Sequence, residues 1–304
     1  MRISKNIDSP GHGESGDSAV QLGPRRVQKK RRASGKERKR DESRRAKSEP
    51  SHTFSLRSII LRAGMGKQGL CILHEDNHII IVNKMPSDIV QGDKTGDVTL
   101  ADRVRDYVRE TKHKTGDVFI GIPHRLDRPT SGAVIFARTS KALQRLGAMF
   151  RDGEVSKIYW AMTAELPPEA QGTLTHWLTR NAEQNKSYAS TKWRPGAREA
   201  RLIYRVLFSL ERYHLLEIEL ETGRHHQVRA QLHAVGCHIK GDLKYGAARS
   251  NPGGGIHLHA RQLAFVHPVS KEKLVITADP PPDPLWDAAV EKWKALQGPG
   301  KRAD

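Results

Sequence analysis

Hydrophobic residues begin to form regular patterns near residue 70 of this 304-residue chain. Residues 71–84 contain two short apolar runs joined by a turn-prone Glu-Asp-Asn trio, and the second run is apolar on both faces. This pattern predicts two strands, the second of which is buried in a sheet. Apolar and β-branched runs predict further strands at residues 133–137, 157–164, 202–210, 215–221 and 274–277.

Other segments place apolar residues at helical spacing. Thr99 is a suitable N-cap for the first of them, and Gly153 is a suitable stop for the second. These patterns predict helices at residues 99–111, 140–153 and 225–235. A C-terminal amphipathic helix carries Trp286, Val290 and Trp293 on one face, and we expect its tryptophans to pack onto the sheet.

The order of these elements predicts an α+β fold. Strands follow one another without a regular βαβ alternation, which favours a mixed, largely antiparallel sheet with flanking helices. The patterned region defines one expected domain at residues 67–298, preceded by an expected disordered basic tail at residues 1–66. The longest purely apolar run, residues 79–82, is far shorter than the roughly 18 residues that a membrane span requires, so we expect no membrane association.

Charge is concentrated in the tail. The whole chain has 52 Lys and Arg against 34 Asp and Glu, and its first 50 residues have 15 against 7. Residues 25–47 contain no Trp, Tyr, Phe, Leu or Ile, so we expect them to be disordered. The tail could anchor RNA phosphates, or it could be a solvated basic extension. Two cysteines do not make a disulfide framework, which favours a reducing compartment, the cytoplasm.

One loop sets a carboxylate among basic residues. Residues 121–132 are punctuated by glycine and proline, and within them Asp127 lies between Arg125 and Arg128. Such a carboxylate would be kept ionised by its neighbours. It could serve as a nucleophile or stabilise a cationic sugar, or it could form a simple loop ion pair. Spacing alone leaves these alternatives open.

Four blocks in this chain resemble those of the RluA-type pseudouridine synthases. Residues 124–132 read HRLDRPTSG and resemble the family's signature, which carries a catalytic aspartate. Residues 157–161, KIYWA, resemble its second block, and residues 222–229, TGRHHQVR, resemble its third. Residues 241–246 resemble the G-D-x-x-Y-G that follows. The blocks stand in the family's order, and the likeness runs from about residue 70 to about residue 280.

The resemblance implies roles for individual residues. Asp127 would be the catalytic carboxylate, Tyr159 would stack on the target uracil, and Arg229 would pair with the aspartate. Arg125 would fill the space that a flipped-out uridine vacates. The implied RNA-binding residues are His124, Arg125, Arg224 and Gln227.

The resemblance also implies the fold of the pseudouridine synthase catalytic domain and an RNA substrate, ribosomal or transfer. Isomerising uridine involves no redox change, so we expect no cofactor. Histidines at residues 225–259 lie close in sequence, but without a Cys-x-x-Cys pair we expect no metal. We also expect a monomer. A second hypothesis is a non-catalytic RNA-binding or ribosome-assembly protein, and a third is a glycoside hydrolase, which would require a second carboxylate near Asp127.

Overall fold

The computed structural model describes residues 69–92 and 96–298. The predicted tail, residues 1–66, lies outside the described residues, and so does the start of the predicted domain. No helix within the described ranges is both long enough and apolar enough to cross a bilayer.

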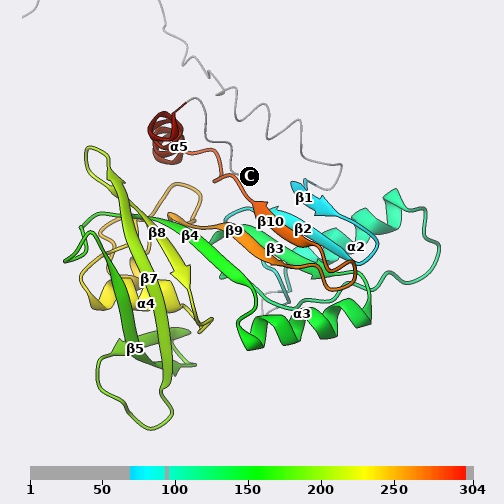
Figure 1. The fold of residues 1–304 in the computed structure, drawn as a ribbon, viewed down its shortest axis with the longest axis horizontal. Helices are drawn as coiled ribbons and strands as arrows, with labels where there is room; N and C mark the ends of the chain where they lie inside the picture. Colours follow the sequence, from blue (N-terminus) through cyan, green and yellow to red (C-terminus); the bar gives the residue numbers. More distant parts are fainter. Residues whose placement is uncertain (1–68, 93–95, 299–304) are drawn as a thin grey trace, which may run out of the picture. The chain divides into compact units, whose positions relative to one another are not determined.

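In the described part of the chain, ten strands form a single sheet in the order β1-β2-β3-β9-β4-β8-β7-β5-β6, with β10 paired to β9 (Figure 1). Of the described pairs only β3 and β9 run parallel, which confirms the predicted mixed, largely antiparallel sheet. The strands are β1 (Ile72–Glu75), β2 (Ile79–Lys84), β3 (Ser131–Ala137), β4 (Ser156–Thr163), β5 (Gln171–Asn181), β6 (Lys186–Ser190), β7 (Arg198–Ser209), β8 (His214–Leu220), β9 (Leu258–Val266) and β10 (Lys273–Thr277).

The apolar run in β2 is buried because helices cover both faces of this part of the sheet. Ile80 and Val82 belong to a core cluster with residues of α2 (Leu100–Thr111). Ile79 and Ile81 point the other way, into a cluster with residues of α3 (Ser140–Asp152). Alternate side chains of a strand point to opposite faces, so a strand covered on both sides is apolar at every position.

The sequence signals for helix ends are confirmed for the first two helices. Thr99 caps α2 in a capping box with Asp102. The chain leaves α3 at Gly153, which has a left-handed φ of 79°. The described part of the chain also contains α4 (Gln227–Ala234), a short 3-10 helix η1 (Leu243–Tyr245) and α5 (Pro284–Gln297).

The remaining helices cover the other half of the sheet. Residues of α4 pack against β5, β7 and β8. Trp286 of α5 is buried against Trp160 and Leu215, and Trp293 meets Trp160 edge-on with ring centroids 5.7 Å apart. The predicted packing of the last helix is therefore confirmed.

Four elements differ from the sequence prediction. Helix α4 begins at Gln227 and not at residue 225, because His226 has a left-handed φ of 53° that no helix accommodates. Strands β5, β6 and β9 were not predicted: β5 and β6 have few apolar residues, and polar side chains interrupt the apolar pattern of β9. The β5–β6 hairpin contributes to the cleft described below.

Gly132 is required where β3 meets β9. Its φ is 122°, and a Cβ atom built there would lie 2.4 Å from the carbonyl oxygen of Ala260. Only glycine allows the two strands to approach this closely. The close approach places the loop before β3, which contains Asp127, at this end of the sheet.

Candidate active site

Asp127 lies in a tight turn that leads into β3. Its carbonyl oxygen accepts a hydrogen bond from the backbone N–H of Thr130 at 3.0 Å. Its side chain is 27% exposed, so the carboxylate can be reached from solvent. The backbone is thus constrained while the acid group remains accessible.

Lys84 holds this turn in place. It ends β2, its side chain is fully buried, and its ammonium donates to the carbonyl oxygens of Met85 (3.0 Å), Arg128 (3.0 Å) and Thr130 (2.6 Å). Burial lowers the pKa of Lys84 to about 8, although nearby carboxylates act in the opposite direction. The buried ammonium fixes the chain that follows the aspartate.

Arg229 of α4 links two carboxylates. Its guanidinium makes a bidentate pair with buried Asp242, with Nε–Oδ2 at 2.6 Å and Nη2–Oδ1 at 2.8 Å. Its remaining nitrogen, Nη1, donates to Asp127 Oδ2 at 3.3 Å. Burial alone would lower the pKa of Arg229, but hydrogen bonds and charge from the two carboxylates raise it. Asp242 therefore orients the arginine, and the arginine presents a fixed positive charge to Asp127.

His226 is the second basic side chain beside Asp127. Its Nε2 lies 3.6 Å from Asp127 Oδ2, and its Nδ1 lies 3.0 Å from the hydroxyl of Tyr245. The ring stacks on His225 with centroids 3.8 Å apart. Burial and then the charge of Arg229 lower the pKa of His226 to about 2, so the ring is neutral at physiological pH. The left-handed backbone of His226 is what turns this ring toward the carboxylate.

Tyr159 of β4 lies beside Asp127. The two residues line a small cavity of about 70 Å³, and the tyrosine ring also packs against the core. Burial and then the negative charge of Asp127 raise the pKa of Tyr159. The phenol therefore stays protonated at every physiological pH.

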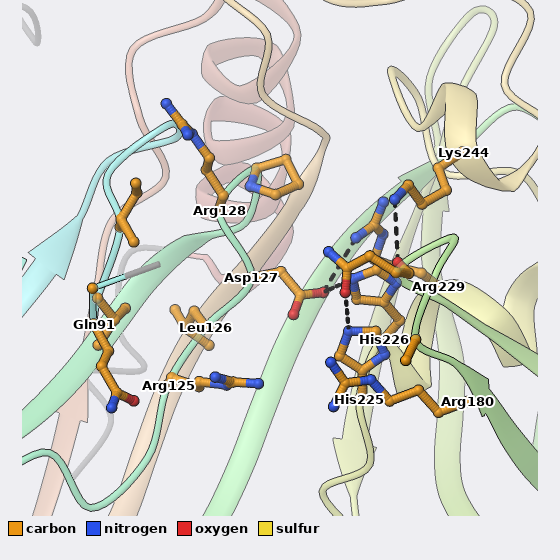
Figure 2. Close-up of a pocket in the computed structure, with 16 residues that line it drawn as sticks. Gln91, Arg125, Leu126, Asp127, Arg128, Arg180, His225, His226, Arg229 and Lys244 are labelled. Atoms are coloured by element: carbon orange, nitrogen blue, oxygen red, sulfur yellow. Dashed lines mark hydrogen bonds and ion pairs between the residues drawn. The ribbon is translucent and has the colours of Figure 1, made fainter. Parts of the chain in front are cut away.

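Above these groups lies an open cleft of about 620 Å³. Figure 2 shows the Asp127 carboxylate pointing across it toward Arg229 and His226, with Arg180 on the same far wall. The basic side chains that line the cleft are Arg125, Arg128, Arg180, Arg229 and Lys244. A cleft with one carboxylate and this many cations suits a polyanionic ligand.

Comparison with known proteins identifies the family. The family model for RNA pseudouridylate synthase matches residues 78–234. The chain is 32% identical over 223 residues to ribosomal large subunit pseudouridine synthase D of Zymomonas mobilis, covering 70% of this chain and 69% of that protein. The chain belongs to the RluA-type RNA pseudouridylate synthase family. The family suggested by the four sequence blocks is confirmed.

A second curated relative and a solved structure are also similar to this chain. A protein of Synechocystis sp. named as an uncharacterized RNA pseudouridine synthase is 34% identical over 219 residues, and the match spans 70% of this chain and 65% of that protein. The solved structure of human RNA pseudouridylate synthase domain containing 4 covers 78% of this chain and 96% of its own, with a TM-score of 0.61 and 23% identity. The pseudouridine synthase fold predicted from the resemblance is thereby confirmed.

The structure brings together the three predicted catalytic residues of this RluA-type chain. Asp127 and Arg229 are in contact, and Tyr159 shares a cavity with both. Arg125 is exposed and lines the large cleft. Their chemical roles stay predictions.

The other three predicted RNA-binding residues are placed differently. Arg224 is exposed, lines the small cavity and donates from Nε to the carbonyl oxygen of Glu199 at 3.0 Å. Gln227 is buried, and its Oε1 accepts hydrogen bonds from Thr222 and from the backbone of Arg224. Both arrangements fix the loop that leads into α4.

His124 does not line either cavity. Its Nε2 accepts a hydrogen bond from the backbone N–H of Ile135 at 2.9 Å, and its ring stacks on Phe150 at 4.3 Å. Burial lowers the pKa of His124 to about 3, so it carries no charge for a phosphate. This geometry gives His124 a role in packing the loop against β3.

Sequence reasoning missed several site residues. His226 and Asp242 stand inside the quoted blocks but received no role, although a polar residue within a motif is itself a signal. Arg180 was missed because β5 was missed. Nothing in the local pattern marks Lys84 or Lys244, because their partners are backbone atoms or lie far along the chain.

Proposed function

We propose that this protein is an RNA pseudouridine synthase that isomerises a specific uridine in structured ribosomal or transfer RNA. Asp127 is the catalytic carboxylate, Tyr159 stacks on the base, and Arg229 pairs with the aspartate. The observation that supports this most strongly is the contact between Asp127 and Arg229 on the floor of a basic cleft. Membership of the RluA-type family supports the same reaction.

The main chemical requirement of the reaction is an ionised carboxylate. The N1–C1′ bond breaks, the base turns, a C5–C1′ bond forms and the proton at C5 moves to N1 through solvent or a side chain. Substrate and product are isomers, so no electron or group is gained or lost and no cofactor is required. A carboxylate can attack the sugar or base, or stabilise oxocarbenium-like charge, and each route requires it to be charged. The fixed positive charge of Arg229 favours that state.

Tyr159 acts through its ring and its neutral hydroxyl. Since its pKa is raised, the phenol does not serve as a phenolate base at neutral pH. The ring face can pack on uracil, and the hydroxyl can hydrogen-bond to it. In this proposal another group removes the proton at C5. The candidate is Asp127, the carboxylate that lines the same small cavity as Tyr159.

RNA is the proposed partner because the cleft combines cations with one carboxylate. A uridine inside folded RNA has to be extruded before it can reach Asp127, and Arg125, exposed at the rim, occupies the vacated space in our proposal. The name of the Zymomonas relative, a ribosomal large subunit enzyme, supports ribosomal RNA as a first substrate to test. We further propose that the protein acts in the cytoplasm as a monomer.

Replacement of Asp127 tests the proposal directly. Asp127→Asn keeps the shape but removes the charge, and we expect it to lower tritium release from 5-tritiated uridine in RNA by about 10³-fold or more. Binding of the same RNA should change by less than about threefold, because one carboxylate does not attract phosphates. Asp152→Asn, at a solvent-exposed carboxylate on α3, is the matched control and should retain full activity.

The alternative, a non-catalytic RNA-binding or assembly protein, predicts a different result. Wild type and Asp127→Asn would then bind RNA equally and neither would release tritium from any RNA of the host, ribosomal or transfer. That outcome would reject the proposal that the protein is an enzyme. Mapping pseudouridines in total RNA with and without the gene then identifies the modified uridine.

A further inference from the structure

A second hollow lies beside β6, outside the catalytic cleft. It has a volume of about 620 Å³ and shares no lining residue with that cleft. We call it the β6 groove, and its main lining residues are His176, Thr179, Tyr188, Ser190, Arg194 and Ala234. The residues that lead from β6 to β7, 191–197, form one of its walls.

Two exposed aromatic side chains are found in and next to the groove: Tyr188 lines it, and Trp193 is the sequence neighbour of the lining residue Arg194 without lining the groove itself. Trp193, in the segment between β6 and β7, is 61% exposed, and Tyr188 on β6 is 47% exposed. The Tyr188 hydroxyl donates to Gln184, and the Lys186 ammonium lies 5.3 Å from the centroid of its ring, so the ring is held in position. Tryptophan is usually mostly buried, so an exposed tryptophan close in sequence to an exposed tyrosine that is held in place favours a binding surface.

The segment that contains these rings is mainly basic, although the acidic residues Glu183 and Glu199 stand at its two ends. Residues 184–198 include four basic side chains and no acidic one, and the basic residues are Lys186, Lys192, Arg194 and Arg198. Aromatic faces among cations are the features with which proteins bind single-stranded nucleic acid, since each base offers a face for stacking and each phosphate a negative charge.

The groove is connected to the catalytic cleft through one hairpin. Arg180 and Asn185 of the β5–β6 hairpin line the cleft, and Thr179 and Tyr188 line the groove. Tyr188 is three positions after Asn185, and three steps along an extended chain correspond to about 10 Å. One strand of RNA can therefore reach both places.

We propose that the β6 groove binds an unpaired segment of the substrate RNA next to the reacting uridine, with a base stacked on Trp193 or Tyr188 and phosphates on Arg194 and its basic neighbours. The inference rests on the proposed function, because it assigns a second contact for the same RNA. It adds a specificity element: the groove selects RNAs in which the nucleotides flanking the target are single-stranded.

Binding by the full chain tests the stacking. With a fluorescein-labelled oligouridylate, Trp193→Leu should weaken affinity by about tenfold, because it removes one base–aromatic stack. Trp193→Phe keeps a ring and should stay within about threefold of wild type. Duplex RNA of the same length should bind all three proteins equally. Phe119→Leu, at an exposed aromatic outside the groove (46% exposed), is the matched control and should bind like wild type.

The salt dependence of binding separates stacking from charge. Arg194→Gln should reduce the slope of log affinity against log salt by about 0.7, the value for one phosphate contact on a single strand. Trp193→Leu should lower affinity without changing this slope. An oligoglutamate that competes in wild type and loses its affinity in Trp193→Leu would identify an acidic peptide as the occupant and overturn the proposal.

A kinetic experiment distinguishes failure of the groove from failure of the proposed function. If wild type forms pseudouridine, we expect Trp193→Leu to raise KM for RNA about tenfold and to leave kcat unchanged, since the ring lies outside the catalytic cleft. Equal KM and equal oligouridylate affinity in wild type and Trp193→Leu would overturn the proposal that the β6 groove binds RNA. If wild type forms no pseudouridine in any host RNA, the proposed function fails, and the oligouridylate experiment still decides whether the groove binds RNA.

Discussion

Lys84 places a cation in the core beside the reactive loop, and three carbonyl oxygens satisfy it. Arg229 is held in a similar way. The Asp242 carboxylate orients its guanidinium, which presents its charge to a different carboxylate, that of Asp127. In both cases the cation that meets Asp127 or the residues following it is held in place by more than one oxygen. Such support keeps reacting groups in position without movement at the moment of reaction.

Lys84→Met tests whether Lys84 is a positioning residue. The variant keeps the length of the side chain but removes the ammonium that donates to three carbonyl oxygens, so we expect it to lower the free energy of unfolding by about 2 kcal/mol. We also expect kcat to fall about tenfold or more while KM for RNA stays within about twofold, because the loop shifts but the rim does not. Tritium release and urea unfolding measure the two effects.

The pH dependence of stability gives a further readout for Lys84. Its pKa is about 8 in the folded protein against an ordinary 10.5, so the unfolded chain binds more protons between these pH values. The stability of wild type relative to Lys84→Met should therefore rise as pH increases from 8 to 10.5. A stability difference that does not change over this range would contradict the lowered pKa of Lys84.

Among the elements, α5 is fastened to the sheet at its first turn. Asp283 is its N-cap and accepts hydrogen bonds from the backbone N–H groups of Leu285 (2.9 Å) and Trp286 (3.3 Å). The same carboxylate lies 2.9 Å from Nε2 of His257, whose ring stacks on Trp286. Burial would raise the pKa of Asp283, but these hydrogen bonds outweigh it and hold the pKa at about 2.

Asp283→Ala should therefore lower the free energy of unfolding by about 1–2 kcal/mol near neutral pH. The sign of the pH dependence follows from the lowered pKa. The contribution of Asp283 is fully present above its ordinary pKa of 3.8 and is lost as pH falls toward 2. Urea unfolding of both proteins at several acidic pH values should show their stabilities converging, and curves that stay parallel down to pH 2 would contradict the assignment.

For the whole molecule, charge is divided between the first 50 residues and the catalytic part. The first 50 hold 15 of the 52 basic residues, and the cleft and β6 groove hold others. Basic residues that meet phosphates release counterions, so each adds to the salt dependence of RNA binding.

Deletion of residues 1–66 should weaken RNA binding and reduce its salt slope by several units, while kcat stays within about twofold. Binding measured from low to high salt and tritium release at saturating RNA are the two measurements. An unchanged salt slope would contradict a role of the tail as an RNA anchor. It would favour the alternative, in which the tail is only a solvated basic extension. A large loss of kcat would show that the tail takes part in the reaction itself.

Local sequence determined the fold class, most of the core elements and the position of Asp127. Strand β2 was predictable because an apolar run of this length can only be buried on both faces, and α2 and α3 were predictable from spacing and caps. The blocks around residues 127, 159 and 229 could be recognised in the sequence because each is a short motif. Strands β5 and β6 could not be recognised from the sequence, since most of their side chains are polar.

Only the tertiary structure decided which residues meet. Asp127 and Arg229 are 102 positions apart, and the sheet order brings them into contact. The same holds for Asp242 behind Arg229 and for Lys84 behind the Asp127 loop. Residues far apart in the chain leave no periodic or spacing signal in a single sequence, because their proximity follows from how strands pair and not from what surrounds each one locally.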